Sequence, residues 1–527
     1  MGAEHRLRLS SPDTQQQAMA TTTSSDLESA RARVAAAYDP RTFAAAGEKV
    51  ITTLADHLRR VEARDAAALN WNEPAALVRD AEQSLAGGGK STDVPARIQE
   101  LASQALARGQ NLHHPHYVGH QVPASVPLAA LFDLLGSVTN QGMAIFEMGP
   151  FATAVEHAVV AAVGEQLGFA PGTFTGLVTS GGSLANLTAL LTARNVALGE
   201  SWTAGIVNQG PAPVIVAHAD IHYSVTRSAG ILGLGTDNIR VAALDADRRM
   251  DANRLDDQLR ELRSRGGPIV AVASAACATP IGAFDRLREI ADVCRRHEVW
   301  LHVDAAHGGA AAFSATHRHL VDGLAEADSV ICDAHKMLFV PALAAMVFYR
   351  DRAHRFTAFE QQAPYLYDPI ATTLADYDSG LVTIECTKRA AAFGLWGIWS
   401  TFGPQIFSDM VDVTFDLAQK LHALLSAADD FETLHVPECN IVAFRHLPAQ
   451  LRDAAPDEID LFQLRLRRSV IESGEYYLVQ SNLDGRNVLR TTIMNPLTTA
   501  DDLRGLLECL RRHGALLLRE GEAPAEL

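Results

Sequence analysis

The spacing of apolar residues changes twice along the chain. Over residues 28–125 the apolar side chains recur at helical intervals, and over residues 126–400 short β-branched runs alternate with amphipathic helices. Residues 401–518 form a shorter mixture of both patterns. These changes predict a helical N-terminal segment, a large α/β domain and a small α+β domain. The polar residues 1–27 are expected to be a disordered leader, and residues 519–527 a short frayed tail.

Five apolar runs of the middle block are expected to be buried parallel strands of one sheet, with helices between them. They are residues 214–217, 269–273, 299–303, 329–332 and 345–349. Residues 285–297 form the clearest intervening helix, with Asp285 as its expected N-cap. In the small domain we expect strands at residues 440–444 and 488–493, and a helix at residues 501–513.

Composition narrows the functional class. The chain has 527 residues, and its net charge of −17 argues against nucleic acid or an anionic membrane as a partner. The six cysteines are scattered without a Cys-x-x-Cys pair, which is typical of a reduced cytoplasmic protein and predicts neither a disulfide framework nor a metal site. No apolar run reaches the roughly 20 residues of a membrane span, and the N-terminus lacks the pattern of a secretion signal.

Two of the expected strands lead into ionisable side chains. Asp304 closes one strand, and Lys336 follows the next. Because ligands of open α/β sheets bind beyond the carboxyl ends of strands, we expect both side chains in one cleft. A buried Asp needs a positive partner such as a protonated pyridine nitrogen, and a partly desolvated Lys has a lowered pKa and is a Schiff-base nucleophile. Taken singly, Asp304 also fits a helix cap or a metal ligand, and Lys336 fits a surface loop.

Two further elements are expected at the same edge of the sheet. Gly182 and Ser183 begin an apolar-periodic helix, with Ser183 at the expected N-cap, and free N–H groups there favour a phosphate. His222 follows the strand at 214–217 and can lie flat against an aromatic cofactor. By themselves these residues also fit an ordinary helix start and a structural histidine.

Together these elements resemble the group II decarboxylases that depend on pyridoxal 5'-phosphate (PLP). That family includes aromatic-amino-acid, glutamate, cysteine-sulfinate and diaminobutyrate decarboxylases. The most specific match is His302-Val-Asp304-Ala-Ala followed by His335-Lys336. The resemblance implies the type I, aspartate-aminotransferase-like fold, with a mostly parallel seven-stranded sheet, helices on both faces and a small C-terminal α+β domain. It also implies a homodimer with its sites at the interface, formed in part by the N-terminal helices.

The resemblance assigns roles to matching residues. Lys336 would carry the cofactor, Asp304 would pair with its ring nitrogen, and His222 would stack on its ring. The remaining cofactor contacts would be Gly182, Ser183 and His335 at the phosphate, Ala306 under the ring, and Thr279. Arg490 would bind the α-carboxylate of the substrate, for which a planar guanidinium is suited. Tyr365, on a lid expected at residues 355–373, would protonate Cα.

The chain departs from the family at two places. Ala275-Ala-Cys277-Ala-Thr279 stands where the family has Thr-x-Gly-Thr-Thr, so two hydroxyl groups near the ring hydroxyl of the cofactor are lost. Asp333 stands near the phosphate where some members have Asn. An ionised Asp would repel a phosphate, so we expect Asp333 to face away or to be protonated.

The expected reaction is α-decarboxylation of an L-amino acid to its amine and CO2. One rival is an oxygen-consuming aldehyde synthase, in which the lid tyrosine or the stacking histidine is lost in related enzymes; the presence of Tyr365 and His222 favours the plain decarboxylase. Another rival is a catalytically dead PLP-binding scaffold, against which the retention of Lys336, Asp304 and His222 argues.

The substrate side chain is expected to be polar. His120 and Gln121 match the family stretch that lines the side-chain pocket, and an aromatic side chain would leave their donors unpaired. A second carboxylate, a sulfinate or a distal amine would satisfy them, with Glu147 as a candidate partner for the amine. An aromatic substrate stays the alternative if both residues face solvent.

Overall fold

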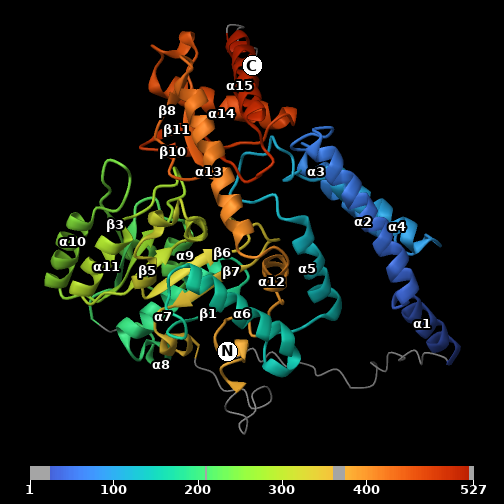
Figure 1. Ribbon diagram of the computed structural model, residues 1–527, viewed down its shortest axis with the longest axis horizontal. Helices are drawn as coiled ribbons and strands as arrows, with labels where there is room; N and C mark the ends of the chain where they lie inside the picture. Colours follow the sequence, from blue (N-terminus) through green and yellow to red (C-terminus); the bar gives the residue numbers. More distant parts are fainter. Residues whose placement is uncertain (1–23, 208–209, 360–373, 522–527) are drawn as a thin grey trace, which may run out of the picture. The chain divides into compact units, whose positions relative to one another are not determined.

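The computed structural model describes residues 24–207, 210–359 and 374–521 (Figure 1). Contacts divide the chain into two compact units. The first comprises Met1–Arg59 and Asn72–Gly109, and the second comprises Arg60–Trp71 and Gln110–Leu527.

The first unit is helical, as the apolar spacing predicts. Its helices are α1 (Ser24–Ala37), most of α2 (Pro40–Glu62), α3 (Pro74–Ala86) and α4 (Val94–Arg108). The side chain of Asp93 accepts a hydrogen bond from the backbone N–H of Ala96 and so caps α4. Because α1 begins at Ser24, residues 24–27 are helical and the expected leader is too long by four residues.

The second unit contains a seven-stranded sheet in the order β1-β7-β6-β5-β4-β2-β3. Its strands are β1 (Thr175–Thr179), β2 (Val214–His218), β3 (Ile239–Ala242), β4 (Ile269–Ala275), β5 (Leu301–Asp304), β6 (Ser329–Asp333) and β7 (Ala345–Tyr349). Neighbouring strands from β3 to β6 are parallel, but β7 is antiparallel to both β6 and β1. The prediction of a parallel strand at 345–349 was therefore wrong, because the short link from β6 contains no crossover helix.

Both faces of this sheet are buried. Val216, Val272 and Val303 belong to one hydrophobic cluster, whereas Ala217 and Ala273 belong to another, as the alternation of side chains along a strand requires. The helices of this domain are α5 (Pro127–Thr139), α6 (Pro150–Gln166), α7 (Gly182–Leu198), α8 (Ser201–Ala204), α9 (Ser224–Ile231), α10 (Ala252–Ser264), α11 (Leu287–Arg296) and α12 (Phe393–Phe402).

The small domain packs three helices on a four-stranded antiparallel sheet of order β10-β11-β9-β8. Its elements are α13 (Gln405–Ser426), β8 (Phe431–Thr433), β9 (Ile441–His446), α14 (Pro456–Ser473), β10 (Val479–Leu483), β11 (Arg486–Thr492) and α15 (Ala500–Gly521). The expected strands and helix are present here. Helix α15 runs to Gly521, so it includes residues 519–521 of the expected tail.

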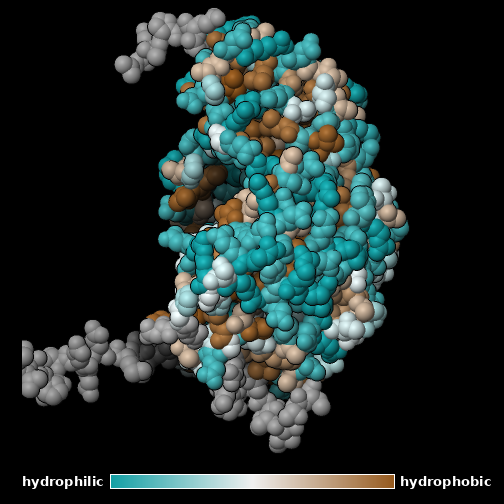
Figure 2. Space-filling model, turned by 90° about the vertical axis from the view of Figure 1, so that its left-hand side faces the viewer, coloured by the Kyte–Doolittle hydropathy of each residue, from teal (hydrophilic) through white to brown (hydrophobic). Residues whose placement is uncertain are grey.

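The surface shown in Figure 2 is mainly hydrophilic, and hydrophobic residues appear on it in scattered groups. Among the described residues, no helix has the length and apolar composition needed to cross a membrane. The apolar side chains of the second unit are concentrated in its core clusters.

Asp285 does not cap α11, contrary to the sequence-based expectation. The N-cap position is Arg286, and the carboxylate of Asp285 is buried beneath β4. It accepts hydrogen bonds from the backbone N–H of Met250 at 2.6 Å and of Ala275 at 2.8 Å, and from the hydroxyl of Ser274 at 2.7 Å. An acid that precedes a helix can satisfy donors on a neighbouring strand instead, and the local sequence does not distinguish the two cases.

Candidate active site

A cavity of about 310 Å³ lies at the carboxyl ends of β2, β4, β5 and β6, where the sequence places the cofactor cleft. It brings together residues from separate segments of the chain. Those predicted from sequence that line it are Gln121, Gly182, Ser183, His222, Thr279, Asp304, Ala306, His335 and Lys336.

The amine of Lys336 lies beside a carboxylate. Its Nζ is 3.2 Å from Oδ2 of Asp333, which is buried. Burial lowers the pKa of Lys336, but Asp333 and Asp304 outweigh that effect and raise the pKa above its ordinary value. This reverses the expected pKa depression, and it also corrects the expectation that Asp333 faces away, because Lys336 balances its charge. His335 is held by the backbone of Ala344, with Nδ1 2.8 Å from the carbonyl oxygen.

Helix α7 presents its N-terminus to the same cavity. Its N-cap is Gly181 rather than Ser183, and the φ of 124° at Gly181 is one that residues with a side chain rarely adopt. Ser183 therefore lies in the first turn, whose backbone N–H groups have no partner within the helix and can bind an anion. A Cβ on Gly182 would lie only 2.8 Å from Oδ2 of Asp333, so a side chain at this position would have to displace the Asp333 carboxylate.

Asp304 ends β5 as a buried carboxylate. Its Oδ1 accepts a hydrogen bond from the backbone N–H of Ala306 at 3.2 Å, and its Oδ2 accepts one from Nδ2 of Asn186 at 2.9 Å. Both donors are neutral, and no ion pair within 4 Å joins Asp304 to a cation of the described ranges. A buried carboxylate in this state is ready to receive a cation from the cavity.

His222 stands on the loop after β2. Its Nδ1 lies 2.8 Å from the hydroxyl of Ser224 and also accepts a hydrogen bond from the backbone N–H of Ser224 at 3.3 Å. Burial lowers the pKa of His222 below its ordinary value, although the negative charge of Asp304 opposes this effect. Because Nδ1 accepts from the backbone N–H of Ser224, a neutral ring carries its proton on Nε2.

Arg490 is a buried arginine without an acidic partner in the described part of the chain. It donates to the carbonyl oxygen of Thr279, a cavity residue, and to the hydroxyl of Thr492, each at 3.1 Å, while its Nε has no partner. Burial lowers the pKa of Arg490 to about 10. A buried guanidinium without an acidic partner is suited to bind an anion.

Among the described residues, the cavity lining lacks three predicted site residues: Arg490, His120 and Glu147. His120 is exposed, and its ring lies tilted 5.7 Å from that of Tyr477, because adjacent residues of the irregular segment point in different directions and only Gln121 faces the cavity. Glu147 is exposed on the short helix Phe146–Met148 and does not line the cavity. Tyr365 and most of its expected lid lie outside the described residues.

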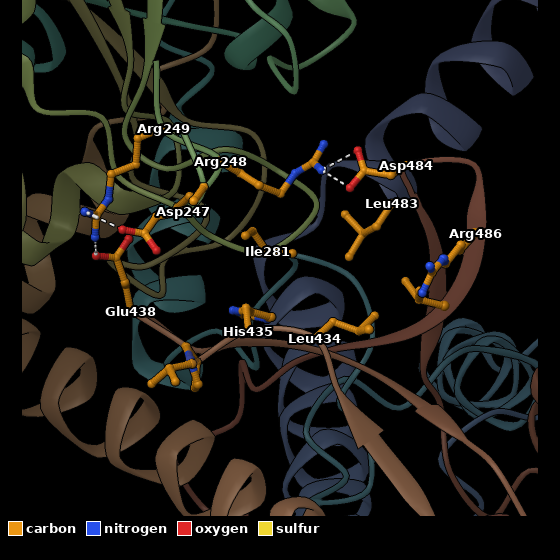
Figure 3. A pocket seen from close by; sticks show the side chains of 15 residues that line it. Asp247, Arg248, Arg249, Ile281, Leu434, His435, Glu438, Leu483, Asp484 and Arg486 are labelled. Carbon is orange, nitrogen blue, oxygen red and sulfur yellow. Dashed lines mark hydrogen bonds and ion pairs between the residues drawn. The ribbon is translucent and has the colours of Figure 1, made fainter. Parts of the chain in front are cut away.

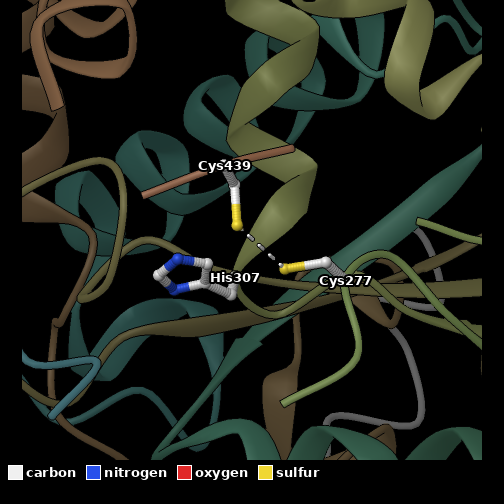
Figure 4. Close-up of side chains that lie close together, drawn as sticks. All are labelled: Cys277, His307 and Cys439. Carbon is white, nitrogen blue, oxygen red and sulfur yellow. Dashed lines mark hydrogen bonds between the residues drawn. The ribbon is translucent and has the colours of Figure 1, made fainter. Parts of the chain in front are cut away.

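Two thiols and an imidazole meet beside the cavity (Figure 4). The sulfurs of Cys277 and Cys439 are 3.9 Å apart, and one ligand atom from each of these cysteines and from His307 lies within 4.8 Å of the others. Residues of these types bind zinc, although the sequence spacing predicts no metal site. However, Nε2 of His307 is hydrogen-bonded to Asn440 at 2.7 Å, and the neighbouring thiol and burial raise the pKa of Cys277. We therefore describe the thiol of Cys277 and the imidazole of His307 as neutral groups beside Cys439.

A larger cavity, of about 700 Å³, lies between the loop after β3 and the β10–β11 hairpin (Figure 3). Two of its three lining arginines are paired within it: Arg248 bonds to Asp484 at 2.7 Å, and Arg249 pairs with Glu438. None of the site residues predicted from sequence lines this cavity. Size alone therefore does not identify the reactive site.

Asn186 belongs to the site although sequence reasoning gave it no role. It lies one helical turn after Gly182 on α7 and is buried against Asp304. Spacing of four residues on a helix places both residues on the same face, and this is the signal that would have found it.

The buried histidines predict a pH dependence of stability. Burial lowers the pKa of His114 and His302 to about 4 and that of His307 to about 3. In the unfolded chain histidine titrates near about 6.5, so below that pH the unfolded state binds protons that the folded state does not. The free energy of unfolding should be independent of these groups above pH ~7 and fall by about 1.4 kcal/mol per pH unit for each group at lower pH.

Urea denaturation at several pH values between about 7.5 and 5 would measure this slope, since most carboxylates stay ionised in that range. His307→Asn should reduce the pH dependence of the unfolding free energy by the contribution of one histidine, about 1.4 kcal/mol per pH unit. The control His319→Asn replaces an exposed histidine and should leave this pH dependence unchanged. Equal slopes in both variants would contradict the assignment of buried neutral histidines.

The residues present fit PLP. The cavity contains the amine of Lys336, the α7 N-terminus that would hold the phosphate, and Asp304, whose unpaired charge would hold the protonated ring nitrogen. His222 would cover one face of the ring.

Comparison with known proteins agrees with this geometry. A family model described as the pyridoxal-dependent decarboxylase conserved domain matches residues 91–447. The chain is 34% identical over 424 residues to L-2,4-diaminobutyrate decarboxylase of Rhizobium meliloti (strain 1021), covering 80% of this chain and 82% of that protein. It is 29% identical to cysteine sulfinic acid decarboxylase of Rattus norvegicus, over 84% of this chain and 90% of the relative. The crystal structure of mouse CSAD superimposes with a TM-score of 0.82 at 27% identity, over 90% of this chain and 99% of that chain. The chain therefore belongs to the pyridoxal-dependent decarboxylase family and is a PLP-dependent amino-acid decarboxylase.

Proposed function

We propose that the enzyme decarboxylates an L-amino acid with a polar side chain, and that a diamino acid such as L-2,4-diaminobutyrate is its preferred substrate. The observation that carries the proposal is the 34% identity over 424 residues to L-2,4-diaminobutyrate decarboxylase of Rhizobium meliloti (strain 1021). The cavity is compatible with a distal ammonium, because Lys336 is the one Lys or Arg among its described lining residues.

Arg490 supports binding of the α-carboxylate. Its guanidinium is buried without an acid and has an unpartnered Nε. A substrate carboxylate would supply the missing charge, and two N–H groups in one plane would hold it in one orientation. Holding the carboxylate in one orientation fixes which bond to Cα lies across the cofactor plane.

The other residues have separable roles in this proposal. PLP, when bound, supplies the electron sink that stabilises the charge left on Cα. Asp304 holds the ring-nitrogen proton, Lys336 holds or releases a proton at Nζ, and His222 excludes water from one face of the ring. The role of Tyr365 as the proton donor to Cα stays part of the proposal; its replacement by phenylalanine would favour the aldehyde-synthase outcome.

Acidic substrates are the second candidate. Gln121, which lines the cavity, can donate hydrogen bonds to a carboxylate or sulfinate. The rat relative is a cysteine sulfinic acid decarboxylase, and a human relative at 26% identity is named an acidic amino acid decarboxylase.

We also propose that the enzyme is a homodimer. Helix α5 carries a row of large apolar side chains that are each 45–55% exposed: Leu128, Leu131, Leu134, Leu135 and Val138. A contiguous exposed apolar face of this kind is typical of a protein interface.

Competition between amino acids tests the substrate. We expect the specificity constant for L-2,4-diaminobutyrate to exceed those for glutamate, aspartate and cysteine sulfinate by about tenfold, or about 1.4 kcal/mol, with tyrosine and tryptophan lower still. Gln121→Leu should narrow the difference in specificity constant between L-2,4-diaminobutyrate and tyrosine, because it removes a half-buried amide from the cavity lining. A tenfold preference for tyrosine or tryptophan would refute the polar pocket, and a preference for the acids would select the second candidate.

A further inference from the structure

A chain of hydrogen bonds runs beneath the cavity and ends at Asp304. Nε1 of Trp300 donates to the hydroxyl of Ser329 at 2.9 Å, and that hydroxyl lies 2.9 Å from Nδ1 of His302. Nε2 of His302 lies 2.7 Å from Oδ1 of Asn186, whose Nδ2 donates to Oδ2 of Asp304 at 2.9 Å. Trp300, Ser329, His302, Asn186 and Asp304 are each at most 8% exposed, so water does not compete for these contacts.

The charge of Asp304 determines every proton position in this chain. A carboxylate only accepts hydrogen bonds, so Asn186 must present its NH₂ group to Asp304 and its oxygen to His302. His302 must then donate from Nε2 and accept at Nδ1 from the hydroxyl of Ser329. The indole of Trp300 can only donate, and the oxygen of Ser329 is free to accept it. Each donor thus has one acceptor, and the arrangement favours an ionised Asp304.

Asn186 also reaches the residue on the opposite side of the cofactor site. Its Nδ2 is 2.8 Å from the hydroxyl of Ser224, which lies 2.8 Å from Nδ1 of His222. Since the backbone N–H of Ser224 also points at Nδ1, that nitrogen accepts and the proton of His222 is on Nε2. One N–H group of the Asn186 amide therefore donates to Asp304, and the other donates to the Ser224 hydroxyl that contacts His222.

We infer that Asn186 is a positioning residue that holds Asp304 as a carboxylate and His222 in its Nε2–H tautomer at the same time. The inference rests on the proposed function, because it assigns Asn186 an effect through the cofactor's ring nitrogen. Asn186 would act on the reacting atoms through Asp304 and His222.

The first test is Asn186→Asp, which keeps the size and the oxygen that accepts from His302 but removes the N–H donors. The turnover number should fall by at least about tenfold while KM changes by less than about twofold. The matched control is Asn195→Asp on the same helix. Asn195 is also buried, but its amide bonds to the carbonyl oxygen of Thr357, away from the cavity, and turnover should stay within about twofold of wild type.

Replacing the cofactor separates positioning from a general structural role. The wild-type enzyme and Asn186→Asp are each reconstituted with PLP and with its 1-deaza analogue, in which C–H replaces the ring nitrogen. If Asn186 acts through Asp304, the ratio of wild-type to Asn186→Asp turnover should shrink to within about twofold with the analogue. An equal loss with both cofactors, or turnover within about twofold of wild type with PLP, would overturn the inference.

A second variant keeps the test decisive if Asn186→Asp does not fold. Ser329→Ala breaks the chain at its far end, so it should lower turnover by a smaller factor with the same dependence on the ring nitrogen. The pH titration of the visible cofactor band should shift in both variants and stay unchanged in Asn195→Asp. If the wild type turns over no amino acid, the proposed function fails, but the titration of the cofactor band still tests the role of Asn186. A band that does not shift in either variant would overturn the inference about Asn186.

Discussion

Replacing Lys336 with alanine is expected to abolish the covalent link between protein and cofactor and to lower turnover by at least about 10³-fold, since nucleophile and proton carrier are lost together. Borohydride reduction of the wild-type enzyme, followed by peptide mass spectrometry, should find the pyridoxyl adduct on Lys336 and no stable adduct in the variant. Lys336 is the lysine of the cavity that also contains Asp304, and its Nζ lies 3.2 Å from Asp333.

Lys420→Ala is the matched control. Lys420 lies on α13, its side chain is 53% exposed, and it pairs with Asp416 one turn away. This variant should keep both the adduct and the wild-type turnover. Recovery of the adduct from any lysine other than Lys336 would refute the assignment.

The second large effect is expected for Asp304→Ala. Without the carboxylate the ring nitrogen of the cofactor loses its proton, the electron sink weakens, and turnover should fall by about 10²–10⁴-fold. The fold should lose only about 1–3 kcal/mol, because one donor of Asn186 is left without its acceptor while a buried charge is also removed. Steady-state assays and urea denaturation of the same preparations measure both quantities.

Asp285→Ala gives the opposite pattern and serves as the comparison. Asp285 accepts from two backbone N–H groups and a hydroxyl beneath β4 and does not line the cavity. Its loss should cost stability more than turnover per folded molecule. If Asp304→Ala instead lost stability and kept near-normal turnover, Asp304 would be a structural residue like Asp285.

Local patterns were sufficient to predict the fold class and the shared cleft of Asp304 and Lys336. β-branched runs separated by amphipathic helices predicted the α/β domain, because burial on both faces of a sheet leaves a continuous apolar run in each strand. Asp304 and Lys336 were predicted to share a cleft because each lies at or just beyond the carboxyl end of a buried strand, and parallel strands place those ends along one edge. The edge strands β1 and β3 were not predicted. Strand β3 gave a weak signal because it is partly exposed and its apolar run is short.

The tertiary structure alone decided which partners these residues have. The pairing of Asp333 with Lys336 reverses the expected direction of the lysine pKa, since a nearby charge outweighs burial. Cys277 meets Cys439 across 162 residues of sequence, and Asn186 meets Asp304 across 118. A one-residue difference separates Gln121, in the cavity, from the exposed His120. Periodicity along the chain reports which face of an element is buried, but contacts between distant segments depend on how the elements pack, and that packing leaves no local pattern in the sequence.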